Sequence, residues 1–219
     1  GGETVHALRG VSFTIHEGEF VTIMGTSGSG KSTLLNLLGC LDTPTTGEYK
    51  LDGVSVQSMS KNERAVTRNR KIGFVFQSYN LLPKTTALEN VELPLLYNPK
   101  VSARQRRDMA TKALEAVGLH DRLYHKSNQM SGGQQQRVAI ARSLIYRPAL
   151  RLADEPTGNL DQKNSKEIID MLKLSNRNLE QTVVLITHDE RVALEAERII
   201  TIEDGRIIGD GRKEVKLLS

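Results

Sequence analysis

The segment Gly25-Thr-Ser-Gly-Ser-Gly-Lys-Ser32 most constrains what this chain can fold into. It fits the phosphate-loop pattern G-x-x-x-x-G-K-[ST], with an apolar run at 20–24 before it and a helix-favouring run at 32–38 after it. Glycines let backbone N–H groups approach an anion without a Cβ in the way, and the new helix directs its positive end at the same point. The segment therefore predicts a strand, loop and helix that bind phosphate.

Side chains in and after this loop have predicted roles. Lys31 supplies a mobile positive charge suited to β- and γ-phosphates, and the Ser32 hydroxyl is placed to reach Mg²⁺. The predicted phosphate-binding residues are Gly25, Thr26, Ser27, Gly28, Ser29, Gly30, Lys31, Ser32 and Thr33.

The composition is that of an ordinary globular protein. With 219 residues, of which 38% are hydrophobic and 26% charged, the chain can bury one core with a smaller lobe attached. It contains no apolar run long enough to span a bilayer and no signal peptide at Gly1-Gly-Glu-Thr4, which predicts a cytoplasmic chain. The single cysteine, Cys40, excludes an internal disulfide, and its leucine neighbours predict a packed thiol.

The net charge of +4 does not indicate a nucleic-acid partner, because the basic residues are interleaved with 26 acidic ones. The densest basic cluster, 64–71, lacks aromatic residues. It predicts a solvated helix face, with a phosphate or lipid-headgroup contact as the alternative, and the same holds for Arg104, Arg106 and Arg107.

Strand and helix patterns alternate, which predicts an α/β fold with a mostly parallel sheet, an inserted helical lobe and a C-terminal hairpin. Strand patterns occur at 11–15, 20–24, 48–51, 72–76, 150–153, 183–187, 199–202 and 206–208. Helical patterns occur at 32–38, 103–117, 133–145, 163–174 and 190–196, and they fill nearly all of 88–145.

Polar residues follow four of the predicted strands. The phosphate loop follows 20–24, Gln77 follows 72–76, Asp154 and Glu155 follow 150–153, and His188 with Asp189 follows 183–187. Ligands of open α/β sheets bind outside the carboxyl ends of the strands, so these residues are expected to converge on one site.

In motif content and order the chain resembles the nucleotide-binding subunits of ABC transporters over essentially its full length. A Ser131-Gly-Gly-Gln134 signature between the phosphate loop and Asp154-Glu155 separates this family from kinases, GTPases and helicases. Finer features resemble the lipoprotein-release and macrolide-export branch, with a cell-division ATPase as a close cousin; they lie at 39–44, 74–77, 87–94, 134–142 and 154–161.

The resemblance implies a single ABC ATPase domain, 1–219, with a P-loop NTPase core, a mostly parallel sheet, an antiparallel β portion and an inserted helical subdomain. The RecA-like core with its β portion would comprise 1–87 and 147–219, and the helical subdomain carrying the signature would comprise 88–146.

The resemblance also implies roles in ATP hydrolysis. Glu155 would act as general base, and Gln77 would sense the metal and the attacking water. His188 would contact the γ-phosphate, and Lys31 would hold phosphates. Adjacent carboxylates suit this chemistry, since one serves the metal while the other reaches the nucleophile. The implied Mg²⁺ ligands, direct or through water, are Ser32, Gln77 and Asp154.

The signature opens a helix with two glycines and would form a second anion-binding site. The resemblance implies a head-to-tail dimer in which Ser131, Gly132, Gly133 and Gln134 close over ATP bound to the partner, with Asn159, Leu160 and Asp161 along the interface.

The loop after Gln77 would meet a short cytoplasmic helix of a membrane permease. There Tyr79, Leu81 and Leu82 are either exposed apolar anchors or packing at the lobe junction.

The resemblance thus implies an ATPase subunit, soluble when isolated, held at the cytoplasmic face of the inner membrane by a separate permease that exports or extracts a lipoprotein, macrolide or peptide. The alternative is a mechanotransmitter that acts on a membrane scaffold in cell division without transport. A soluble ABC ATPase acting on DNA or ribosomes is the remote alternative, because the chain has no long coiled-coil insertion and no tandem domain.

Three residues depart from the pattern of the family. Relatives carry an aromatic residue near the N-terminus that stacks on adenine, whereas His6 is the only ring among the first ten residues here. Arg151 interrupts a strand expected to be buried on both faces, so it requires an acidic partner, an escape route at a sheet margin, or a perturbed strand and lower stability. Glu180 replaces a common glycine and predicts a local loop adjustment.

Overall fold

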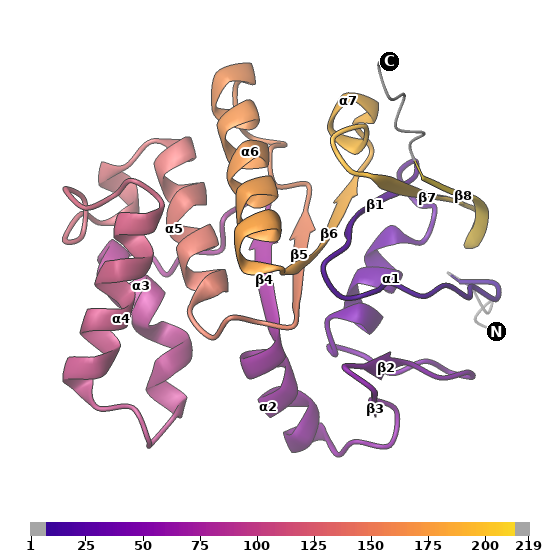
Figure 1. Cartoon of the computed structure of the whole chain (residues 1–219), viewed down its shortest axis with the longest axis horizontal. Coiled ribbons are helices and arrows are strands. Elements are labelled where there is room, and N and C mark those ends of the chain that lie inside the picture. Colours follow the sequence, from indigo (N-terminus) through magenta and orange to yellow (C-terminus); the bar gives the residue numbers. More distant parts are fainter. Residues whose placement is uncertain (1–7, 213–219) are drawn as a thin grey trace, which may run out of the picture.

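Residues 8–212 are described by a computed structural model in which a six-stranded sheet runs through the molecule in the order β4-β5-β6-β1-β7-β8 (Figure 1). Neighbouring strands are parallel except β8, which pairs antiparallel with β7. The strands are β1 (Phe20–Met24), β4 (Ile72–Phe76), β5 (Leu150–Asp154), β6 (Thr182–Thr187), β7 (Arg198–Glu203) and β8 (Arg206–Arg212). A separate antiparallel hairpin is formed by β2 (Lys50–Leu51) and β3 (Val54–Ser55).

Most helices begin at a serine, threonine or aspartate whose side chain accepts a hydrogen bond from the first turn, as at Ser60, Thr86, Ser102 and Asp161. The helices are α1 (Lys31–Leu38), α2 (Lys61–Lys71), α3 (Ala87–Glu92), α4 (Ala103–Ala116), α5 (Gly132–Leu144), α6 (Gln162–Leu179) and α7 (Glu190–Ala193), with 3₁₀ turns η1 (Leu93–Tyr97) and η2 (Ser127–Gln129). Helix α6 ends at Glu180, which has a left-handed φ of 52° where glycine is favoured.

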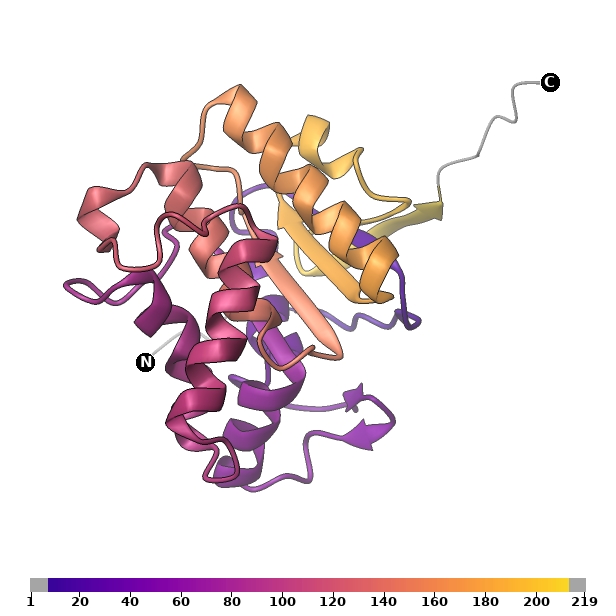
Figure 2. The ribbon, with the colours of Figure 1, turned by 60° about the vertical axis from the view of Figure 1, so that its left-hand side comes forward.

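Two apolar cores cover the two faces of the sheet, because successive strand residues point to opposite sides. On one face, Val183 and Leu185 of β6 pack with α3, α4, α5 and α6. On the other, Val184 and Ile186 pack with α1 and the β2–β3 hairpin. Figures 1 and 2 show α3, α4 and α5 gathered beside β4, away from β7 and β8.

The parallel sheet, the C-terminal hairpin and the helical segment beside the sheet confirm the predicted fold class, but several element boundaries were wrong. Residues 11–15 form no strand, although Val11, Phe13 and Ile15 are half-buried against the core. The strand predicted at 48–51 is reduced to Lys50–Leu51, and 88–145 is interrupted by irregular segments at 98–102 and 117–126. These errors share a cause: apolar spacing reports which residues are buried, whereas an element also needs backbone hydrogen-bond partners.

The structure also tests the predictions made for Cys40 and for the basic segment 64–71. Cys40 is buried, as predicted for a packed thiol, and burial raises the pKa of that thiol. Helix α2 has no buried residue, so its basic side chains lie at the surface, where the Arg68 guanidinium also donates to the Cys40 carbonyl at 2.8 Å. Within residues 8–212, none of the helices combines the length and apolar character needed to cross a membrane.

Arg151 lies in β5 and is fully buried, facing α6. Its Nη1 donates to Ser175 Oγ at 2.7 Å and its Nη2 to Gln181 Oε1 at 2.8 Å, while Nε has no partner among the described residues. Desolvation lowers the pKa of the guanidinium to about 9, so the charge persists at neutral pH. Arg151 therefore has neutral partners, and the expectation of a perturbed strand was wrong, since β5 keeps its register with β4 and β6.

We expect Arg151→Leu to raise the free energy of unfolding by about 1–3 kcal/mol, because it removes a buried charge whose partners are neutral. Urea denaturation measures this change. Arg177→Leu, at an exposed position of α6, is the control and should shift stability by no more than about 0.5 kcal/mol. A less stable Arg151→Leu protein would mean that the two hydrogen bonds outweigh the desolvation cost.

Candidate active site

Four parallel strands end at one edge of the sheet and bring the predicted site residues together. The register places Phe76 of β4 opposite Asp154 of β5, and Met24 of β1 opposite Thr187 of β6. The phosphate loop, Gln77, Glu155 and His188 each follow one of these strand ends. The predicted convergence is therefore present in the fold.

The phosphate loop has the backbone that its glycines predict. Gly28 and Gly30 have left-handed φ values of 79° and 106°. A Cβ on Gly25 would lie 2.5 Å from both Ile202 O and Ser29 Oγ. Helix α1 then begins at Lys31, and its first N–H groups have no intrahelical acceptor. These N–H groups are the unpaired polar groups that the loop offers to an anion, whereas Ser29 Oγ is buried and has no partner among the described residues.

Lys31 folds back over this loop. Its Nζ donates to the Gly25 carbonyl at 2.5 Å and to the Thr26 carbonyl at 2.7 Å. Desolvation lowers the pKa of Lys31, while the nearby charges of Glu155 and Asp154 oppose that shift. The ammonium group is thus held at the mouth of the phosphate loop by weak carbonyl acceptors, for which phosphate oxygens are stronger substitutes.

Glu155 is held from both sides. Its Oε1 accepts a hydrogen bond from the His188 N–H at 2.9 Å and lies 2.6 Å from His188 Nδ1, and its Oε2 accepts from the Thr187 hydroxyl at 3.0 Å. The structure therefore pairs two predicted site residues directly. Thr187 was missed by sequence reasoning, although its position as the last residue of β6 marked it as a neighbour of the site.

Asp154 lies beside Glu155 at the end of β5. Burial raises the pKa of Asp154, repulsion from Glu155 raises it further, and Lys31 lowers it. The part of the chain that the structure describes holds no cluster of three or more His, Cys, Asp or Glu able to bind a metal. Mg²⁺ does not need one, because it takes one or two protein oxygens and completes its shell with waters and phosphates. The Asp154 carboxylate and the Ser32 hydroxyl fit that requirement.

Gln77 forms hydrogen bonds with a neighbour that the sequence did not predict. Its Nε2 donates to Asn159 Oδ1 at 3.1 Å, and Asn159 Nδ2 donates back to the Gln77 carbonyl at 3.1 Å. A Cβ on Gly158 would lie 2.5 Å from Gln77 Nε2, so a side chain at this position would displace the Gln77 amide. The predicted coupling segment 159–161 thus contacts Gln77 within one chain.

The signature residues form a helix start. Ser131 Oγ accepts from the Gln134 N–H at 3.2 Å, and Gln134 Oε1 accepts from the Ser131 N–H at 3.0 Å, which caps α5. Cβ atoms on Gly132 and Gly133 would collide with Tyr79 Oη and the Asn164 side chain. Among the described residues, the side-chain hydrogen bonds of Ser131 and Gln134 stay within the start of α5, and α5 packs on the face of the sheet opposite α1.

The loop after Gln77 has both packed and exposed apolar side chains. Leu81 packs against the core and Leu82 is exposed, while Tyr79 is half-buried. Two left-handed residues, Tyr79 and Asn80, shape the loop, and Arg142 of α5 donates to their carbonyls at 3.1 and 2.8 Å. His6, the ring nearest to the N-terminus, lies outside the described residues.

Known proteins resemble the chain in sequence over nearly its full length. Residues 8–158 match the family described as "ABC transporter". An uncharacterized ABC transporter ATP-binding protein of Thermotoga maritima is 55% identical over 215 residues, 98% of this chain and 91% of that protein. The macrolide export ATP-binding/permease protein MacB of Bdellovibrio bacteriovorus is 50% identical over 97% of this chain, which spans 32% of MacB.

Solved structures resemble it as well. A dimeric post-hydrolysis state of the ATP-binding cassette MJ0796 bound to ADP and Pi, a protein of Methanocaldococcus jannaschii, superposes with a TM-score of 0.88 and 49% identity, over 97% of this chain and 93% of that one. The phosphate loop, the signature and the fold define a P-loop ATPase with an ATP-binding cassette. The chain belongs to the ABC transporter family as one of its ATP-binding ATPases, which confirms the resemblance inferred from the motifs.

The charges around Asp154 predict two opposite pKa changes. Glu155→Gln should lower the pKa of Asp154, because it removes a neighbouring negative charge, and Lys31→Ala should raise it, because it removes a positive one. Carboxyl ¹³C shifts followed against pH measure both. Changes of the same sign in the Asp154 pKa of the two variants would contradict the arrangement of these three side chains.

Proposed function

We propose that this chain is the ATP-hydrolysing subunit of a transporter and works as a dimer on a separate membrane permease. The observation that carries the proposal is the convergence of the phosphate loop, Gln77, Asp154 and Glu155 at one sheet edge, with Glu155 held by His188. The polypeptide would comprise a core of 1–87 and 147–219 and a helical subdomain of 88–146.

The proposed chemistry is transfer of the γ-phosphoryl group to water. Lys31 and the loop amides would hold the phosphates, and Ser32 and Asp154 would hold Mg²⁺, which would neutralise phosphate charge. Glu155 orients the attacking water and accepts its proton, and His188 stabilises charge near the γ-phosphate. Gln77 would be a further residue that holds the metal, directly or through water.

The proposed dimer is head-to-tail. The placement of α5 and α1 on opposite faces of the sheet supports it, since Ser131–Gln134 would close over nucleotide only from a second copy. The MJ0796 cassette, 49% identical, is dimeric in its solved structures, which supports association of two copies. Asn159, Leu160 and Asp161 would then lie along the interface and couple its two sites.

Two substitutions test the ATPase assignment. Lys31→Ala should weaken ATP binding about tenfold or more, since hydrogen bonds to charged groups contribute ~1.5–3 kcal/mol. Glu155→Gln should keep ATP binding, lose hydrolysis by about 10²-fold or more, and accumulate an ATP-bound dimer. Steady-state ATPase assays and light scattering with Mg-ATP measure these changes, with Lys61→Ala as an exposed control. Parental hydrolysis by Glu155→Gln would contradict its role as base.

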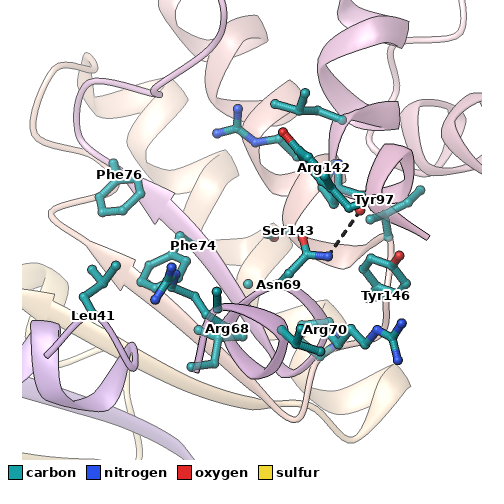
Figure 3. Close-up of a pocket in the computed structure, with 18 residues that line it drawn as sticks. Leu41, Arg68, Asn69, Arg70, Phe74, Phe76, Tyr97, Arg142, Ser143 and Tyr146 are labelled. Carbon is teal, nitrogen blue, oxygen red and sulfur yellow. Dashed lines mark hydrogen bonds between the residues drawn. The ribbon is translucent and has the colours of Figure 1, made fainter. Parts of the chain in front are cut away.

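We place the binding site for the permease in a groove of about 740 Å³, which lies between α2 and β4 on one side and η1 and the end of α5 on the other (Figure 3). Its floor includes the stacked rings of Phe74 and Phe76, 5.4 Å apart. Its rim exposes Leu41, Val66 and Tyr97 by 49%, 53% and 76%. The groove is apolar at the centre, with the guanidinium groups of Arg68, Arg70 and Arg142 around it.

This lining suits a short helix with an apolar face and a carboxylate, presented by the permease at the cytoplasmic face of the membrane. Phe76 in the floor directly precedes Gln77, so an occupant of the groove would touch the strand that leads into the active site.

We expect Tyr97→Glu to reduce recovery of the permease with this chain from detergent-solubilised membranes about tenfold or more, as for an aromatic anchor at an interface centre. The control is Tyr124→Glu, since Tyr124 is 68% exposed and lies outside the groove. Equal recovery of the permease with both variants would contradict the groove as its binding site. The partner's transmembrane count and periplasmic domain would separate a transporter from a cell-division scaffold.

A further inference from the structure

Gln136 is a fully buried glutamine in α5, two residues beyond the signature. Its Nε2 donates two hydrogen bonds that leave its own helix, to the Phe76 carbonyl at 2.9 Å and to the Pro156 carbonyl at 2.6 Å. Its Oε1 is also buried and has no partner within residues 8–212. Leaving a polar atom unpaired is unfavourable, so packing alone does not account for an amide at this position.

The two acceptors flank the proposed catalytic side chains. Phe76 directly precedes Gln77, and Pro156 directly follows Glu155. Phe76 also lies opposite Asp154 in the sheet register. The side-chain amide of Gln136 therefore bridges the segments that follow β4 and β5 as they leave the sheet.

The backbone conformation at Glu155 needs contacts that hold it in place, such as the hydrogen bond from Gln136 to the next residue. Glu155 has a left-handed φ of 45°, which a residue with a Cβ adopts only when its surroundings hold it there. The residue that follows is Pro156, which has no N–H to donate, so its carbonyl is its one backbone hydrogen-bonding group, and Gln136 donates to it.

We propose that Gln136 is a positioning residue for ATP hydrolysis: it fixes Gln77 and Glu155 relative to each other and ties both to the helix that begins at Ser131. This inference rests on the proposed function of Glu155 and Gln77. A shift of α5 moves the donor of both hydrogen bonds, so a change at the signature reaches both sides of the hydrolytic site.

This role predicts a specific kinetic signature. The hydrogen bonds of Gln136 go to the ends of β4 and β5, and none goes to the phosphate loop. Loss of the amide should therefore lower kcat and leave nucleotide affinity in place. The adjacent Gln135 is a matched control, because it is half-buried and its Nε2 donates only to Met130 O, at 3.2 Å, near the start of its own helix.

The first experiment compares Gln136→Met with Gln135→Met in the full chain with Mg-ATP. Methionine keeps the length of the side chain and removes both donors. We expect kcat of Gln136→Met to fall about tenfold or more, since small misplacement of catalytic groups costs up to about 10²-fold. KM and the Kd for ATP should stay within about twofold of the parent, as for an interaction that acts in the transition state.

The second variant, Gln136→Glu, tests the donor itself. Burial raises the pKa of an unpaired carboxyl, and the protonated form can donate one hydrogen bond, whereas the ionised form donates none. Its kcat relative to the parent should therefore fall as the pH rises through that pKa. The kcat of Gln136→Met relative to the parent should not change with pH.

Parental kcat in Gln136→Met, or a rise in KM without a fall in kcat, would overturn the inference. Thermal melting would reveal whether Gln136→Met folds. If it does not, a kcat of Gln136→Glu relative to the parent that stays constant with pH would overturn the inference. Glu155→Gln is measured alongside. Parental hydrolysis in Glu155→Gln would reject the proposed function itself, whereas an inactive Glu155→Gln with a fully active Gln136→Met would reject only the role of Gln136.

Discussion

The parallel pairing of β4, β5, β6 and β1 is the constraint on which the rest of this structure depends. Parallel strands end at the same sheet edge, so four segments distant in sequence deliver their next residues to one place. The pairing extends one residue beyond β5, since the Glu155 N–H donates to the Ile186 carbonyl at 2.8 Å. The proposed base is therefore attached to the sheet and does not depend on a free loop for its position.

Helix α5 is the second organising element. Ser131 caps its start, and Gln136 donates to the Phe76 and Pro156 carbonyls, which flank the candidate catalytic residues. Near its end, Arg142 holds the carbonyls of Tyr79 and Asn80 and lines the groove beside β4. A helix is rigid over this length, so signature, site and groove are mechanically joined. That connection is the physical basis of the proposed coupling between nucleotide and a membrane partner.

Sequence patterns predicted the fold class well and the element boundaries less well. Buried strands such as 183–187 and the capped helices gave strong local signals. Segment 11–15 has strand-like spacing but no ladder partner, which local spacing does not report. Arg151 found neutral hydrogen-bond partners because Ser175 and Gln181, distant from it in sequence, happen to face it. The Gln77–Asn159 pair was missed for the same reason.

The sequence by itself determined the chemistry: a phosphate loop ending in Lys31 and Ser32, adjacent carboxylates at 154–155, and a second glycine-bearing helix start at 131–134. Those features are local, because residue type and spacing define them. Tertiary structure alone decided which side chains meet. It paired Glu155 with His188 and Thr187 and placed the amide of Gln136 between two strand ends. Such contacts depend on strand order and register, which arise from packing of the whole chain.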